Sequence, residues 1–255
     1  LYAGYYVLSR GDSFSQMALN ILHIPVNFGC EIGHLWYIYM LIGLYLVTPI
    51  ISPWLQQASK RELEGYLGLW IITTFLPYIH LVYPEVLGEA FWNDTPLLYY
   101  FTGFIGYFIL GYYLKRFGYP SAALSWIILI VGFALSAGIF CSRIDTVPTV
   151  PELELSWGFC TVNVFLMTLG LFSLIGRLSL KGKNAACKLL SDISIKSYGM
   201  YLAHILFLNF YYGLFKSISD AAYVTIPLIA VCTFITVYIF VYLLSYLPKS
   251  KYIIG

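Results

Sequence analysis

The feature that most constrains this chain is an uncharged stretch, residues 35–52. A helix of that length rises by roughly 27 Å, which nearly covers a hydrocarbon core of about 30 Å. Comparable apolar stretches follow at 65–83, 96–114, 121–141, 157–176, 197–215 and 221–247, and a shorter one occupies residues 1–8. We therefore predict an all-α, polytopic membrane protein with seven complete transmembrane helices and an N-terminal partial helix.

Composition supports a membrane protein. Hydrophobic residues make up 60% of the chain and charged residues 10%, and the mean hydropathy is +0.79. Soluble domains have about 45–50% apolar and about 25% charged residues. A transmembrane barrel would show alternating segments of about 10 residues rather than long apolar runs. A single membrane domain is expected to fill residues 1–255.

Two local features refine the expected helices. The Thr48-Pro49 and Ser52-Pro53 steps predict the end of the first complete helix near residue 52, because proline lacks the backbone N–H that a helix needs. Gly103 and Gly106 are expected to allow neighbouring helices to approach closely.

The basic residues predict the orientation, because Lys and Arg near span ends are retained on the cytoplasmic side. Of the 14 basic residues, only Arg10, Arg143 and Lys216 lie in one of the two alternating sets of loops. The other set contains Lys60, Arg61, Lys115, Arg116, Arg177, Lys181, Lys183, Lys188, Lys196, Lys249 and Lys251. We predict that this second set and the C-terminus are cytoplasmic, and that His34 faces outward.

Motifs for metal or nucleotide binding are missing from the sequence. The five cysteines are scattered without a Cys-x-x-Cys pair, and the four histidines lack ligand spacing. The sequence has neither a glycine-rich phosphate loop nor a Gly-x-Ser-x-Gly elbow. We therefore expect no metal, no bound cofactor and no nucleic-acid partner.

Three segments carry a family resemblance. They are His34-Leu35-Trp36-Tyr37 running into Gly43-Leu44-Tyr45-Leu46-Val47-Thr48-Pro49, then Tyr107-Phe108-Ile109-Leu110-Gly111-Tyr112-Tyr113-Leu114, then Ser197-Tyr198-Gly199-Met200-Tyr201-Leu202-Ala203-His204. In this order they resemble acyltransferase family 3, whose members are membrane O-acyltransferases that modify cell-surface polysaccharides. The resemblance implies transfer of an acyl group, most simply acetyl from acetyl-CoA, to a hydroxyl of an envelope glycan. It also implies a multi-pass protein of the bacterial inner membrane, in contact with lipid, acyl-CoA and the glycan acceptor.

The sequence also departs from the family's pattern. Family members have ten spans with both termini cytoplasmic, a first-span histidine eleven positions after an arginine, and an arginine pair near the third span. Neither pattern occurs in this sequence, and Arg10 is its first basic residue. We expect the chain to lack the first two spans, and expect the principal catalytic base to lie in the missing part.

His34 is the first candidate catalytic residue. An alcohol nucleophile needs a general base with a pKa near the operating pH, which histidine supplies most readily. Glu31 lies three residues earlier, so its carboxylate is expected to hold one ring nitrogen if the helix has begun by then. The alternative is that His34 belongs to an interfacial aromatic belt, together with Trp36 and Tyr37.

His204 is the second candidate. It lies about 10 Å into its predicted span, and an ionisable residue at that depth is a functional-site hypothesis. Ser197, Tyr201 and His204 share a helical face with Tyr211. The alternative is a neutral histidine that bonds across to a neighbouring helix.

Aromatic and polar residues near these histidines are candidates for substrate binding. The set comprises Trp36, Tyr39, Tyr45, Ser197 and Tyr201. A transporter or flippase of a lipid-linked or small polar substrate is a rival interpretation, although the paired broken helices of such proteins are not evident. A non-catalytic membrane fragment is the other rival, and it requires no histidine at depth.

Overall fold

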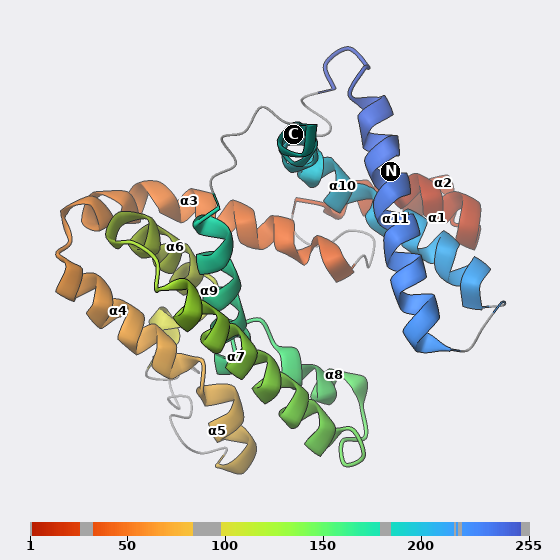
Figure 1. The fold of residues 1–255 in the computed structure, drawn as a ribbon. Helices are drawn as coiled ribbons and strands as arrows, with labels where there is room; N and C mark the ends of the chain where they lie inside the picture. Colours follow the sequence, from red (N-terminus) through yellow and green to blue (C-terminus); the bar gives the residue numbers. More distant parts are fainter. Residues whose placement is uncertain are drawn as a thin grey trace. The chain divides into compact units, whose positions relative to one another are not determined.

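The computed structural model describes residues 2–25, 33–83, 98–178, 185–216, 218 and 221–250. They divide into two compact units, Leu1–Leu178 and Ser179–Gly255, and each unit is described by itself. Within the described ranges all regular secondary structure is helical, which confirms the predicted all-α class (Figure 1). The prediction of a single domain over residues 1–255 stays a prediction.

The first unit contains most of the helices. They are α1 (Tyr2–Arg10), α2 (Phe14–His23), η1 (Gly33–Leu35), α3 (Trp36–Gln57), α4 (Lys60–Thr73), α5 (Leu76–Val82), η2 (Tyr99–Phe101), α6 (Ile105–Phe117), α7 (Ala122–Arg143), α8 (Val150–Leu153), η3 (Glu154–Trp157) and α9 (Val162–Gly176). The second unit contains α10 (Ala185–Lys216) and α11 (Ala222–Leu244). The apolar stretch at residues 1–8 therefore lies mostly in α1.

Helix α3 continues past the end that its prolines predict. It runs through Pro49 and Pro53 to Gln57, so the expected end near residue 52 is wrong. The hydroxyls of Thr48 and Ser52 donate to the carbonyls of Leu44 and Thr48, each at 2.7 Å. The carbonyls that lose an N–H partner are those of Tyr45 and Pro49, four residues before each proline.

The α3 terminus is closed by a side chain from α6. Arg116 donates from Nη1 to the carbonyl oxygens of Leu55, at 2.9 Å, and Ala58, at 3.1 Å. A cation at a helix C-terminus satisfies carbonyls that have no partner within the helix, and it also interacts favourably with the helix dipole. Arg116 thus stabilises the end of α3 and ties it to α6.

The stretch predicted as one span at 65–83 is broken into α4 and α5. Pro77 lies at the start of α5, where its missing N–H costs least. At the break the carbonyl of Thr74 accepts a hydrogen bond from the backbone N–H of Val162, at 3.0 Å. The break therefore joins α4 and α5 to the first residue of α9.

Trp70 of α4 forms the centre of the apolar core of the first unit. It is 0% exposed, and its ring centroid lies 4.8 Å from that of Tyr107 and 5.3 Å from that of Phe165. A Cβ at Gly106 would lie 2.1 Å from the indole, so only glycine leaves room for this ring. The expectation of close approach at Gly106 is confirmed.

Gly103 has a different role from the one expected. A Cβ there would meet no atom within 4 Å, so Gly103 does not allow close packing, and that expectation is wrong. Its φ is +82°, a left-handed conformation that glycine adopts without steric cost. The turn presents the carbonyl of Gly103 to the indole N–H of Trp70, at 3.0 Å.

Helices α7 and α9 lie side by side in backbone contact (Figure 1). A Cβ at Gly132 would lie 2.7 Å from the carbonyl oxygen of Asn163, and a Cβ at Gly170 would lie 2.7 Å from the backbone nitrogen of Leu129. Small residues at helix interfaces permit this approach in membranes, where packing drives association.

Asn163 is a fully buried polar residue beside this interface. Its Nδ2 donates to Ser136 Oγ at 2.6 Å and to the carbonyl of Ser156 at 2.8 Å, while its Oδ1 accepts from the Tyr78 hydroxyl at 2.7 Å. Both amide hydrogens are used in these bonds. Asn163 therefore connects α5, α7, η3 and α9.

The second unit is a helix pair. Met200 and Ala203 of α10 pack against Val237 and Val241 of α11, and all four side chains are buried. The Tyr211 hydroxyl and Thr236 Oγ1 also join the two helices by a hydrogen bond of 2.7 Å.

Four segments are long and apolar enough to cross a membrane: α3, Lys60–Val82, α7 and α11. Val150–Trp157 and α9, bent by 43°, make a fifth if they form one span. Helix α6 has 13 residues and rises only about 20 Å, and α10 includes His204, Asn209 and several tyrosines, which lower its hydropathy. Four or five spans are therefore supported in the described residues, and the count of seven plus a partial helix stays a prediction.

Candidate functional site

His34 lies in η1, immediately before α3, and its ring contacts α1. The Tyr2 hydroxyl is 3.4 Å from His34 Nε2, and the two ring centroids are 5.6 Å apart in an edge-to-face arrangement. Tyr2 is buried and His34 is half-buried. Tyr2 was not predictable as a partner of His34, because a contact across 32 positions between two short helices leaves no periodic signal in the sequence. Glu31, the partner expected for His34, lies outside the described residues.

Trp36 follows His34 at the start of α3 and belongs to an aromatic cluster with Phe104 and Phe159. Its ring centroid lies 5.3 Å from Phe104 and 5.1 Å from Phe159, and those two rings are 6.2 Å apart. Aromatic pairs at such separations stabilise packing beyond the area that they bury. Three segments distant in sequence therefore meet one turn from His34.

A cavity of about 390 Å³ opens beside this cluster, between α3, α6 and α9. Phe104 and Phe159 form part of its wall, and Tyr37, Met40 and Leu44 line it from α3. The hydroxyls of Tyr37, Tyr107 and Thr168 are the polar side-chain groups of the lining. Tyr107 donates its hydroxyl to the carbonyl of Phe159, at 2.7 Å.

A second cavity of about 360 Å³ lies further along the same two helices. It shares Phe108 and Gly111 with the first cavity. Its other lining residues are more polar and include Ser52, Gln56 and Lys115. The groove between α3 and α6 thus changes from apolar at the His34 end of α3 to polar at the Gln57 end.

Tyr39 and Tyr45, two of the predicted substrate-binding residues, lie in different surroundings on α3. The Tyr39 hydroxyl donates to the carbonyl of Ile24, at 2.5 Å, and so joins α3 to the end of α2. Tyr45 is 65% exposed. Among the predicted residues on this helix, Trp36 is the one packed against the cavity wall.

His204, Tyr201 and Ser197 lie on α10 in the second unit. His204 Nδ1 is 2.7 Å from the carbonyl oxygen of Tyr201, and the ring centroids of the two side chains are 5.8 Å apart. Because a carbonyl oxygen only accepts, Nδ1 carries the proton and Nε2 is the basic nitrogen of the neutral ring. Ser197 is exposed and donates to the Ser194 carbonyl of its own helix, at 2.8 Å.

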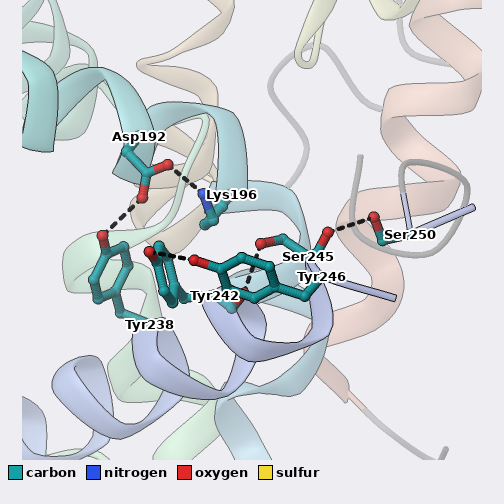
Figure 2. Close-up of polar contacts among 7 residues, drawn as sticks. All are labelled: Asp192, Lys196, Tyr238, Tyr242, Ser245, Tyr246 and Ser250. Carbon is teal, nitrogen blue, oxygen red and sulfur yellow. Dashed lines mark hydrogen bonds and ion pairs between the residues drawn. The ribbon is translucent and has the colours of Figure 1, made fainter. Parts of the chain in front are cut away.

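A polar cluster joins α10 to α11 (Figure 2). Asp192 accepts from Lys196 and, at 2.7 Å, from the Tyr238 hydroxyl. Lys196 is buried, with its Nζ 5.2 Å from the ring centroid of Tyr242. Tyr246 in turn donates to the Tyr242 hydroxyl, at 2.6 Å. Hydrogen bonds from Lys196 and then Tyr238 favour the carboxylate and lower the pKa of Asp192.

This cluster was not predicted, although the sequence contains two signals for it. Asp192 and Lys196 are four residues apart, the spacing of a helical ion pair, and tyrosines recur at 238, 242 and 246 with the same spacing. Within the described parts of the chain, no group of three or more His, Cys, Asp or Glu side chains could hold a metal ion.

The helices and these sites define a helical membrane protein in which an imidazole lies at the entrance of a candidate span, beside an aromatic-walled cavity. The acyltransferase-domain family model matches residues 1–246. The chain therefore belongs to acyltransferase family 3, and the resemblance drawn from the three sequence segments is confirmed. No curated protein and no solved structure shows a significant match to the chain.

Proposed function

We propose that this membrane acyltransferase transfers an acyl group, most simply acetyl, from acyl-CoA to a hydroxyl of a cell-surface or envelope glycan. The observation that carries the proposal is the position of His34, which lies at the entrance of α3 between the buried phenol of Tyr2 and the Trp36 cluster. Family membership supplies the reaction class.

In the proposed reaction the acceptor hydroxyl attacks the thioester carbonyl carbon of acyl-CoA. An imidazole removes the hydroxyl proton, the new C–O bond forms, the C–S bond breaks, and the proton passes to the departing CoA thiolate. His34 assists as a base, and its contact with Tyr2 through Nε2 orients the ring. Glu31 remains the second proposed partner of His34.

His204 is the alternative base of the same reaction. Its Nδ1–H is directed to the Tyr201 carbonyl, and a neutral ring in that tautomer accepts a proton at Nε2. Ser197 and Tyr201 are proposed to contact substrate on this helix, and Trp36, Tyr39 and Tyr45 on α3.

The proposed setting is the bacterial inner membrane, with the C-terminus in the cytoplasm and the His34 end of α3 on the outside. The split of the basic residues supports this orientation. Acyl-CoA is the cytoplasmic donor and is not retained as a cofactor. A reporter fused after Gly255 should be accessible only from the cytoplasm, and external accessibility would reverse the assignment.

The test is acetyl transfer from labelled acetyl-CoA to acceptor glycan in membranes, normalised to folded protein. We expect His34→Ala to lower kcat by about 10²- to 10⁴-fold, the usual contribution of a general acid or base. Tyr2→Phe and Glu31→Gln should cause smaller losses, because each removes only a group that orients the ring. His204→Ala in the same assay distinguishes the two histidines.

His23→Ala is the matched control, because His23 is an exposed histidine at the end of α2. It should retain wild-type turnover. If His34→Ala also retains it at equal abundance, His34 belongs to the aromatic belt and the proposed role is wrong. A rise in KM with kcat unchanged would indicate that His34 only positions the acceptor.

A further inference from the structure

The cavity between α3, α6 and α9 has a chemical character that the acyl-transfer reaction alone does not explain. Except for the hydroxyls of Tyr37, Tyr107 and Thr168, its lining side chains are aliphatic, aromatic or thioether groups, and Gly111 adds none. The Tyr107 hydroxyl is already bonded to the Phe159 carbonyl. A sugar or the two amides of pantetheine would lose hydrogen bonds with water here and regain few, which is costly. A hydrocarbon chain loses nothing.

The size of the cavity also exceeds what an acetyl group needs. At roughly 30 Å³ per heavy atom, the share of a molecule in liquid water, an acetyl group requires about 90 Å³. The cavity holds about 390 Å³, enough for a chain of about a dozen heavy atoms. Its lining residues on α3 begin at Tyr37, three positions after His34, so a chain whose head group lies at that end of the cavity places it about one helical turn from His34.

We infer that this cavity binds the hydrocarbon chain of a lipid-linked acceptor, with the hydroxyl-bearing head group at the His34 end. The inference rests on the proposed function and names its acceptor class: a glycan carried on a hydrocarbon anchor rather than a free polysaccharide. When the chain is bound in the cavity, the acceptor hydroxyl is held at the His34 end. The binding energy of the chain therefore positions the hydroxyl for reaction.

Gly111 offers a direct way to fill the cavity. It lines both cavities, and a Cβ at this position would meet no atom within 4 Å, so a side chain added here starts into the groove without a collision at Cβ. Gly138 of α7 is the matched control, because it also has no atom within 4 Å of a Cβ but is exposed and lines neither cavity. Leucine is a good helix former, so both Gly→Leu changes preserve helix propensity.

The first experiment compares acetyl transfer to dodecyl glucoside and methyl glucoside by the full protein in nanodiscs. The wild type should favour the dodecyl acceptor in kcat/KM, because a chain bound in the cavity positions its hydroxyl for reaction. Gly111→Leu should reduce this preference severalfold, because the new side chain occupies the space of the alkyl chain, and Gly111→Ala should reduce it less. Gly138→Leu should keep the wild-type preference. Equal use of both glucosides by the wild type, or an unchanged preference in Gly111→Leu, would overturn the inference.

The second experiment measures binding without turnover. A dodecyl glucoside with a diazirine in its alkyl chain should label α3, α6 or α9 in the wild type and in Gly138→Leu, and should label Gly111→Leu much less. Labelling that Gly111→Leu leaves unchanged contradicts the chain site. Competition by a long-chain phosphatidylglycerol but not by dodecyl glucoside would assign the cavity to bulk lipid and overturn the acceptor assignment. Gly111-dependent labelling without acetyl transfer to either glucoside would refute the proposed function and retain the chain site.

Discussion

The contact between α7 and α9 makes a stability prediction of definite sign. In Gly170→Ala the new Cβ would lie 2.7 Å from the backbone nitrogen of Leu129 and 2.7 Å from the carbonyl oxygen of Ser125. Ordinary carbon contacts begin at 3.4 Å, so the two helices must separate by about 0.7 Å. The obstructing atoms belong to the backbone, which cannot rotate away as a side chain does.

The magnitude follows from two opposed effects. Overpacking of a tight interface costs about 1–3 kcal/mol. Replacing glycine with alanine in a helix stabilises by about 0.8–1.0 kcal/mol. Because the obstructing atoms are backbone, the overpacking cost should lie in the upper part of its range, at about 2–3 kcal/mol. We therefore expect Gly170→Ala to be destabilised by about 1–2 kcal/mol, which lowers Tm by roughly 2–8 °C for a unit of this size.

Gly138→Ala provides the control, because it makes the same chemical change on α7 where a Cβ meets no atom within 4 Å. We expect it to raise Tm by up to about 4 °C, since only the helix-propensity gain remains. Both variants are measured in mild detergent as the loss of monodisperse protein with temperature. If Gly170→Ala is as stable as Gly138→Ala, then α7 and α9 are not in backbone contact.

Three further predictions use the same thermal assay. Asn163→Ala removes three hydrogen bonds and leaves buried partners unsatisfied, so we expect a loss of about 2–4 kcal/mol. Gly106→Ala should be strongly destabilised by collision with the indole of Trp70, and adding Trp70→Phe should recover part of the loss, a coupling of about 0.5–3 kcal/mol. Because the pKa of Asp192 is lowered in the folded protein, its ion pair with Lys196 should stabilise above about pH 4 and weaken as the pH falls through the folded-state pKa.

Each of these predictions has a contradicting result. An Asn163→Ala variant within 0.5 kcal/mol of the wild type, the usual range for surface changes, would mean that its bonds are replaced by water. If the losses caused by Gly106→Ala and Trp70→Phe simply add in the double variant, the two residues do not interact. Asp192→Asn should lose less stability between pH 5 and pH 3 than the wild type, and equal losses would assign the acid sensitivity to other carboxylates.

The helical class and the membrane setting followed from local features of the sequence. Long uncharged runs have few stable alternatives to helix in lipid, because every backbone polar group must be satisfied within the segment. The bounds of α7, Ala122–Arg143, and of α11, Ala222–Leu244, accordingly lie close to the predicted stretches 121–141 and 221–247. The family resemblance also depended on local strings of residues, and the match over residues 1–246 confirms it.

The candidate site was predictable only in part, because the local sequence shows residue types but not which distant segments come into contact. His34, Trp36 and His204 were identified because their residue types stand out at the start of a span or within one. The partners of His34 and Trp36 were not, because Tyr2, Phe104 and Phe159 reach the site from other segments of the chain.

Tertiary structure also decided where helices break and where they continue. Pro49 and Pro53 signal a helix end in sequence, yet α3 continues to Gln57, where Arg116 of another helix holds its final carbonyls. Gly103 and Gly106 look alike in sequence, but one forms a turn and the other makes room for Trp70. Periodicity and hydropathy show whether each segment is stable in lipid or in water. The cavity between α3, α6 and α9 depends instead on which segments pack together, and contacts between residues far apart in the chain determine that packing.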